Sequence, residues 1–230
     1  MNSLSVIVPI YNEEKFLLES INRLLKNNFF EEILLIDDFS TDNSGKIAKK
    51  IADENKNVRY FLLPKNVGKG GVLEFSQNLI NSSHVIIHDA DLEYFPKDIE
   101  EMFDKTKKFP EFLILGSRFI GTKERSNLYI RTLLANKIMS IFFSLIFFYK
   151  VTDIATCYKL FPSKYFKNII IKENGFAIEV ELLAKFLKKN KSVIEIPIKY
   201  NGRSYSEGKK IKTIDGFKYI YTTIKYRLFN

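Results

Sequence analysis

The sequence is poor in the residues that cross-link or interrupt a chain. It contains one cysteine, Cys157, no tryptophan, six prolines and ten glycines in 230 residues. A single cysteine excludes an internal disulfide and offers no zinc-site spacing, so we expect a reducing compartment. The first residues form an apolar, strand-like run that ends in acids, without the basic segment and cleavage site of a secretory signal.

Long hydrophobic runs are also missing. A largely apolar stretch, IMSIFFSLIFFY, occupies residues 138–149. As a helix it would span about 18 Å, whereas the hydrocarbon core of a bilayer is about 30 Å thick. We therefore predict that it does not cross a membrane. It is either a buried core helix or a helix that dips into a membrane surface.

Negative charge is the scarcer sign. The chain has 36 Lys and Arg against 27 Asp and Glu, which gives a net charge of +9. Eleven basic and three acidic residues lie between 186 and 230, so most of the surplus is in that segment. No zinc-finger, RNP-type or KH-type pattern accompanies it, and we expect no nucleic acid partner. The surplus suits an anionic membrane, a phosphate-bearing substrate or a solvated tail.

Short β-branched runs alternate with helical patterns through the first half of the chain. We predict strands at 4–10, 32–37, 58–63, 85–89, 112–116 and 192–198. Asn12 is expected to cap the first helix. This alternation predicts an α/β fold, with a Rossmann-like, mainly parallel sheet sandwiched by helices.

The pattern changes after Gly121. We predict a long apolar helix at 127–149, a short strand at 158–161, a helix at 177–190 and a C-terminal amphipathic helix at 213–228. Internal repeats and Pro/Gly-rich linkers are absent from the sequence, which predicts a single domain over residues 1–230.

Acidic side chains follow three of the predicted strands. Glu13 comes after the first, Asp38 after the second, and Asp89, Asp91 and Glu93 after the fourth. Ligands of open parallel sheets bind outside the carboxyl ends of the strands, where these acids would meet. Each acidic motif alone is more typical of a loop cap, but their joint position requires a cation to offset the repulsion. Carboxylate oxygens suit a hard divalent ion completed by phosphates.

A glycine-rich turn, NVGKGG at 66–71, precedes another predicted helix. It either lets the backbone approach phosphate or relieves a steric conflict. It matches neither the Walker A pattern nor GxGxxG, so ATPase and dinucleotide functions are disfavoured.

Ordered motifs give the chain a family resemblance. The first five are VPIYNEE (8–14), IDDFSTDNS (36–44), NVGKGG (66–71), DADLEYFP (89–96) and GSRF (116–119). With them the chain resembles the family 2 glycosyltransferases of the GT-A fold. DIATCYKLF (153–161), IPIKYNGRS (197–204) and EGKK (207–210) make it similar to the dolichyl- and polyprenyl-phosphate mannosyl- and glucosyltransferases.

The resemblance implies a nucleotide-sugar-binding half over residues 1–121. In it Pro9, Tyr11 and Glu13 would flank the nucleotide base and ribose, and Asp38 would hydrogen-bond to the base. An acceptor-binding half with the basic C-terminal helix would follow over residues 122–230.

The resemblance also implies a metal site for Mg2+ or Mn2+ on the donor diphosphate. Asp89 and Asp91 would hold the ion, and the backbone near Ala90 would lie close to the sugar. Related synthases often carry Gln where this chain has Glu93, and a glutamate also ligates metal, so Glu93 joins the expected ligands.

Four basic residues match those that face donor and acceptor phosphates in such enzymes: Arg118, Arg131, Arg203 and Lys209. A lipid phosphate acceptor is already ionised and needs positioning by cations, whereas a hydroxyl acceptor needs a general base. Asp153 is the candidate base, and it is equally well explained as a structural cap. Asp91, Arg118 and Asp153 are therefore the expected catalytic residues.

We expect an inverting, metal-dependent enzyme that moves a hexose from a nucleotide sugar of the GDP-mannose or UDP-glucose type to a polyprenyl or dolichyl phosphate. It would be cytoplasmic and peripheral at the inner face of the membrane, in cell-envelope glycan synthesis, with room for a separate membrane-anchoring partner. One alternative is the same donor chemistry with a hydroxyl acceptor in a glycan or glycolipid. Another is a catalytically silent nucleotide-sugar-binding or membrane-scaffold protein.

Overall fold

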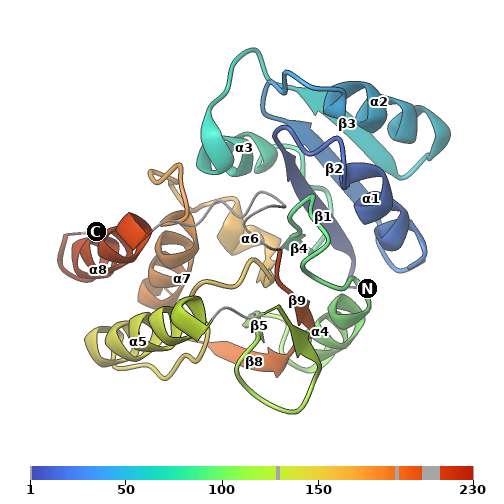
Figure 1. Cartoon of the computed structure of the whole chain (residues 1–230). Helices are drawn as coiled ribbons and strands as arrows, with labels where there is room; N and C mark the ends of the chain where they lie inside the picture. The colour runs from blue at the N-terminus through green and yellow to red at the C-terminus, as the bar shows by residue number, and fades with distance from the viewer. Residues whose placement is uncertain (1, 128–129, 190–191, 204–212, 230) are drawn as a thin grey trace.

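The central element is a seven-stranded sheet, counted within the part of the chain that the computed structural model describes, residues 2–127, 130–189, 192–203 and 213–229 (Figure 1). Its strand order is β3-β2-β1-β4-β7-β5-β8. The strands are β1 (Leu4–Ile10), β2 (Glu32–Asp37), β3 (Val58–Leu62), β4 (His84–Ile87), β5 (Leu113–Ser117), β7 (Lys159–Pro162) and β8 (Val193–Pro197). β6 (Arg125–Ser126) and β9 (Tyr200–Asn201) form a separate parallel pair.

The sheet is parallel except at β7. β1 pairs in parallel with β2 and β4, β2 with β3, and β5 with β8. β7 runs antiparallel between β4 and β5 and is the element that joins them. The predicted mainly parallel sheet is therefore confirmed, and β1 and β2 have the predicted bounds.

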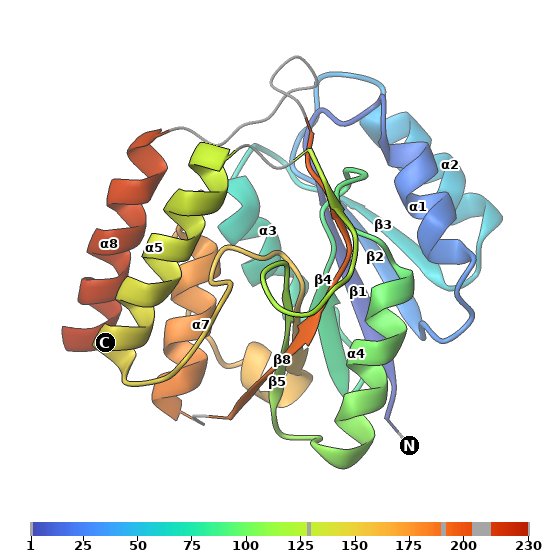
Figure 2. The same ribbon diagram turned by 60° about the horizontal axis from the view of Figure 1, so that its bottom comes forward.

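Helices cover both faces of the sheet (Figure 2). α1 (Leu17–Leu25), α2 (Ser44–Glu54) and α4 (Lys97–Lys108) lie on one face, and α3 (Gly68–Ser76) and α7 (Ile178–Lys189) lie on the other. A short helix, α6 (Ser163–Phe166), follows β7. Because both faces are covered, every residue of β2 is buried, as expected for a parallel strand inside an α/β fold.

α5 (Ile130–Phe147) and α8 (Thr213–Leu228) form a further layer beside α7. α8 contacts both α5 and α7. Within the described residues, neither these nor the other helices combine the length and apolar character that crossing a bilayer requires. α8 has the predicted bounds. Its buried positions include Tyr219 and Tyr226, whereas Phe217 and Tyr221 on its apolar stripe are exposed.

The loop after β1 differs from the prediction that Asn12 caps a helix. Asn12 has a positive φ of 54°, and its side-chain oxygen accepts the N–H of Thr41 at 2.8 Å. The first helix begins only at Leu17, after Phe16, which makes no side-chain cap. Asn12 therefore joins the loops that follow β1 and β2, at the edge where the acidic residues meet.

Candidate active site

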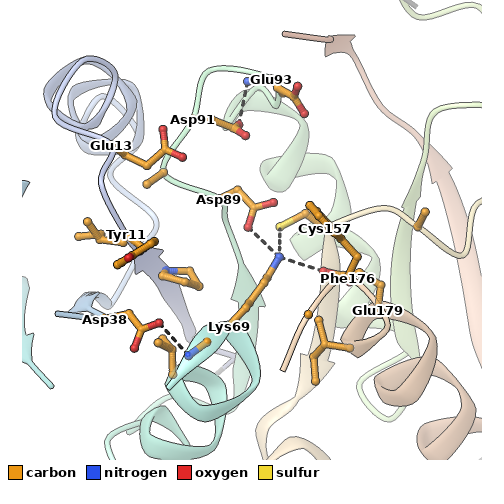
Figure 3. Close-up of a pocket in the computed structure, with 18 of the residues that line it drawn as sticks. Tyr11, Glu13, Asp38, Lys69, Asp89, Asp91, Glu93, Cys157, Phe176 and Glu179 are labelled. Carbon is orange, nitrogen blue, oxygen red and sulfur yellow. Dashed lines mark hydrogen bonds and ion pairs between the residues drawn. The ribbon is translucent and has the colours of Figure 1, made fainter. Parts of the chain in front are cut away.

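A cavity of about 350 Å³ opens at the carboxyl ends of β1, β2 and β4. Its opposite wall is formed by the segments before β7 and α7 and by Tyr219 of α8. Figure 3 shows Asp89 directed at Lys69, which also lies against Cys157 and Glu179, whereas Asp38 is bonded to the start of α3 and Glu13, Asp91 and Glu93 lie farther from Lys69. The predicted residues that line the cavity are Pro9, Tyr11, Glu13, Asp38, Asp89, Ala90, Asp91, Glu93, Arg118 and Arg203.

Asp38 is bound to the start of α3. Its two carboxylate oxygens accept the backbone N–H groups of Val67 at 2.7 Å and Gly68 at 2.8 Å. Burial raises the pKa of Asp38, against the effect of these two hydrogen bonds. The carboxylate thus fixes the glycine-rich turn at one wall of the cavity.

The glycines of that turn have a steric role. A Cβ atom on Gly70 would lie 2.0 Å from the carbonyl oxygen of Glu173, and one on Gly68 would lie 2.9 Å from that of Asn174. Gly68 also has a φ of +75°, which favours glycine. Of the two roles predicted for NVGKGG, the contacts support the steric one, because the turn packs directly against the 173–174 backbone.

Arg203 lies among three carboxylates. Its guanidinium is 3.0 Å from Glu13 Oε2 and 3.0 Å from Asp91 Oδ2, and its Nε is 3.9 Å from Glu93 Oε1. The backbone N–H of Arg203 also donates to Glu93, at 2.7 Å. Its Nε is buried and has no hydrogen-bond partner among the described residues. Burial raises the pKa of Asp91 to about 8, and the charges of Glu93 and Asp89 add to this.

Asp89 has a different cationic partner, Lys69. Lys69 Nζ lies 2.7 Å from Asp89 Oδ1 and 2.9 Å from Glu179 Oε1, and Cys157 Sγ is 3.8 Å away. Burial would lower the pKa of Lys69, but the two carboxylates hold it well above its ordinary value. Lys69 and Glu179 line the cavity and are not among the site residues that the sequence predicts. The signal for Lys69 was a lysine between the glycines of the turn.

Arg118 and Asp153 form a buried, two-pronged ion pair. Arg118 Nε and Nη2 donate to the two oxygens of Asp153 at 2.7 and 2.8 Å, and the Arg118 backbone N–H adds a third bond at 3.0 Å. The guanidinium also lies over the ring of Tyr200, 4.9 Å from its centroid. Arg118 lines the cavity, whereas Asp153 has no exposed surface and lies behind Arg118.

Two of the predicted phosphate-binding residues lie outside what the structure describes. Lys209 belongs to residues 204–212, and Arg131 is the second residue of α5, at a position whose side chain is outside the described part. Both remain predictions.

The donor atoms of the cavity suit a divalent cation. Asp89, Asp91 and Glu93 supply hard carboxylate oxygens, and burial, together with the charges of Glu93 and Asp89, raises the pKa of Asp91. Among the described residues, however, no three acidic, histidine or cysteine side chains form a group arranged to hold a metal ion. Lys69 and Arg203 separate the three carboxylates into two sets. In their chemistry these donors fit a metal, but Lys69 and Arg203 hold the carboxylates in this arrangement, and Arg203 would compete with an ion at Asp91.

The two histidines, His84 and His88, and Cys157 are buried and make contacts within the protein. His88 lies between Ser20 Oγ at 3.3 Å and the hydroxyl of Tyr158 at 3.0 Å. His84 contacts the carbonyl of Pro110 at 3.0 Å. Burial raises the pKa of the Cys157 thiol well above its usual value. A neutral, buried thiol is a poor nucleophile.

Comparisons with known proteins agree with the geometry. The model of the family described as glycosyl transferase family 2 matches residues 5–170. An uncharacterised protein of Methanocaldococcus jannaschii is 29% identical over 229 residues, which cover 97% of this chain and 92% of that protein. The UDP-N-acetylglucosamine–dolichyl-phosphate N-acetylglucosaminyltransferase of Methanococcus voltae is 26% identical over 242 residues, with 97% and 95% covered.

A solved structure shows the same fold. The glucosyl-3-phosphoglycerate synthase of Mycobacterium tuberculosis, in complex with Mn2+, UDP and glucosyl-3-phosphoglycerate, has a TM-score of 0.73 and 15% identity. The match covers 98% of this chain and 80% of that one. At this identity the likeness concerns the fold alone, which is the GT-A arrangement that the sequence predicts.

Proposed function

The chain belongs to glycosyl transferase family 2 and is a glycosyltransferase, and on this basis we propose its reaction. It transfers a hexose from a nucleotide sugar, of the GDP-mannose or UDP-glucose type, to a polyprenyl or dolichyl phosphate. Inversion follows from a single displacement at the anomeric carbon. The Methanococcus voltae relative, whose name gives dolichyl phosphate as its acceptor, supports this choice over nearly its whole length.

The observation that carries the proposal is the pairing of carboxylates in the described part of the cavity with hydrogen-bond donors of the protein. Asp38 binds backbone N–H groups, Asp89 binds Lys69, and Asp91 binds Arg203. Asp153, the candidate base, is enclosed behind Arg118. An acceptor hydroxyl needs a base within hydrogen-bond reach, whereas a phosphate brings its own negative charge. The cavity thus favours an acceptor that is already ionised.

We assign the nucleoside part of the donor to the β1 and β2 loops, with Pro9, Tyr11, Glu13 and Asp38 around it. Asp91 and Glu93, with Asp89 beside them, would hold Mg2+ or Mn2+. Bound there, the ion would offset the negative charge of the diphosphate as it leaves.

The arginines complete the charge balance. Planar guanidinium groups bind phosphate oxygens in pairs. Arg203 is at the carboxylate cluster and is assigned to the donor diphosphate, and Arg118 is assigned to the acceptor phosphate. Asp153 orients Arg118 through both of its oxygens and is a positioning residue in this mechanism. Arg131 and Lys209 are proposed to add positive charge on the acceptor side.

The outer face of α5 and α8 supports action at a membrane surface. On α5 the exposed apolar residues recur every three or four positions, and α5 contains no acidic residue. Exposed Lys137 and Lys150 lie along the same helix and just after it. Apolar side chains flanked by lysines suit the interface of an anionic leaflet. We call this the α5–α8 face: Leu134, Ile138, Ile141, Leu145, Phe148, Phe217, Tyr221, Ile224 and Leu228.

These assignments imply one domain in which residues 1–121 bind the donor and residues 122–230 bind the acceptor. We propose that the protein works at the cytoplasmic face of the membrane, where nucleotide sugars are available, in the synthesis of cell-envelope glycans. A membrane-anchoring partner is compatible with the α5–α8 face.

The test is transfer of label from a panel of radiolabelled nucleotide sugars to polyprenyl phosphate, with Mg2+ or Mn2+, followed by extraction into organic solvent. The wild type should label the organic phase, and Asp91→Asn should abolish the label. Glu19→Gln, at an exposed carboxylate on α1, is the matched control and should retain activity. Transfer to a hydroxyl glycan alone would replace the lipid acceptor in the proposal. Donor binding without any transfer would indicate a silent protein.

A further inference from the structure

Four side chains of alternating charge run from the cavity into the interior. Asp89 pairs with Lys69 at 2.7 Å, Lys69 with Glu179 at 2.9 Å, and Glu179 with Lys159 at 2.6 Å. Figure 3 shows Asp89, Cys157 and Glu179 around the end of the Lys69 side chain. The members come from the end of β4, the start of α3, the first turn of α7 and the start of β7. This charge row therefore links the two halves of the chain.

At the interior end of the charge row, the hydrogen-bonding groups of Lys159 and Glu179 all have partners. Lys159 has no exposed surface, and Nζ donates to the carbonyls of Ile154 and Thr156 as well as to Glu179. Glu179 is 5% exposed, and each of its oxygens accepts from a different lysine. A buried ion pair is tolerated when its remaining donors and acceptors are satisfied, as they are here. The row is thus anchored at Lys159 and ends at the cavity on Asp89.

The net charge of the row decides which sign of charge faces the cavity at Asp89. The two lysines and two carboxylates sum to zero. Lys69 is shared between Asp89 and Glu179, so its charge does not fully neutralise Asp89. Without Glu179 the remaining three groups would carry one net positive charge, directed at the place where a metal and a diphosphate are proposed to bind.

We propose that Glu179 is a positioning residue for the donor metal. By sharing Lys69 from the side of α7, it leaves the negative charge of Asp89 only partly neutralised and available to a divalent cation, which continues the alternation of sign. The inference rests on the proposed donor site, but it concerns a residue that makes no contact with the carboxylates around Arg203.

The experiment compares Glu179→Gln with Glu181→Gln. Glutamine keeps the shape of the side chain and removes its charge. Glu181 lies two residues along α7, is also fully buried, and accepts the N–H groups of Lys172 and Glu173 without lining the cavity. Two affinities are measured for each variant: that for Mn2+ alone, by electron paramagnetic resonance, and that for UDP or GDP without metal, by calorimetry.

Glu179→Gln should change the two affinities in opposite directions. The added positive charge repels Mn2+ and attracts the diphosphate, so we expect Mn2+ to bind about tenfold more weakly and the nucleotide about threefold more tightly. Damage to the fold would weaken both. Glu181→Gln should lower the melting temperature and leave both affinities unchanged.

A second variant restores the charge balance. Glu179→Gln combined with Lys159→Met removes one charge of each sign, and its Mn2+ affinity should return toward the wild-type value. Unchanged Mn2+ binding in Glu179→Gln, a parallel loss of both affinities, or no recovery in the double variant would overturn the proposal. Absence of transfer to lipid by the wild type, with the opposite shifts intact, would refute the proposed acceptor and leave the role of Glu179 standing.

Discussion

The ion pair between Arg118 and Asp153 allows a worked prediction. Asp153→Asn keeps the size of the side chain but leaves the Arg118 guanidinium, 7% exposed, facing an amide in place of a carboxylate. Asp153 accepts three N–H bonds from Arg118, and asparagine offers only one oxygen for them. Breaking a buried ion pair from one side costs about 3–5 kcal/mol, because the remaining charge is uncompensated.

This cost is measurable by thermal and urea unfolding. In a chain of this length, 1 kcal/mol corresponds to about 2–4 °C, so the melting temperature should fall by about 10 °C. Transfer activity should fall with it, because Arg118 loses its fixed orientation.

The matched control is Asp104→Asn. Asp104 forms an exposed pair with Lys107 at 2.6 Å, and such pairs contribute about 1 kcal/mol or less. A melting temperature of Asp153→Asn that equals the wild type, with activity lost, would refute the positioning role. It would return Asp153 to the role of a base.

Three further predictions concern other parts of the molecule. Arg203→Ala removes the cation that competes at Asp91, so Mn2+ alone should bind about tenfold more tightly in paramagnetic resonance titrations, and weaker binding would contradict this. Leu145→Glu should reduce flotation with anionic liposomes, whereas Leu18→Glu, at another exposed leucine, on α1, should not; equal flotation of both would exclude the α5–α8 face. Burial lowers the pKa of His84, so the unfolded chain takes up a proton below about pH 6.5 that the folded protein resists. The free energy of unfolding should therefore fall as the pH drops from 7.5 to 5. The midpoint of urea unfolding should fall less over this range in His84→Gln than in the wild type. An equal fall in the two proteins would contradict this role of His84.

Much of the sheet was predictable because its strands are rich in apolar residues. β1 and β2 have the bounds that the sequence indicates, since buried parallel strands need apolar residues on both faces. The place of β7 was not predictable. Its four residues read as a short strand, but its antiparallel insertion between β4 and β5 depends on contacts distant in sequence.

The candidate site divides in the same way. Acids after three strands were expected at one edge, because parallel strands bring their carboxyl ends together, and the structure gathers them there. The charge row was missed because Lys159 and Glu179 are separated from Lys69 by about half the chain. The prediction that Asn12 caps a helix was wrong, because the Asn12 side chain accepts a hydrogen bond from Thr41 in the neighbouring loop. At this position a hydrogen bond to a residue distant in sequence outweighs the local tendency of asparagine to cap a helix.

The position of β7 in the sheet makes the pairing of β5 depend on segments that are synthesised later. Among the described strands, β5 pairs only with β7 and β8, both of which come later in the chain. A nascent chain therefore cannot fix β5, or the Arg118 that follows it, until Pro162 has left the ribosome. A segment cut at residue 121 would carry β5 without either of the strands that pair with it among the described residues. Recombination between relatives should preserve the segment from β4 to β7 as one inherited unit.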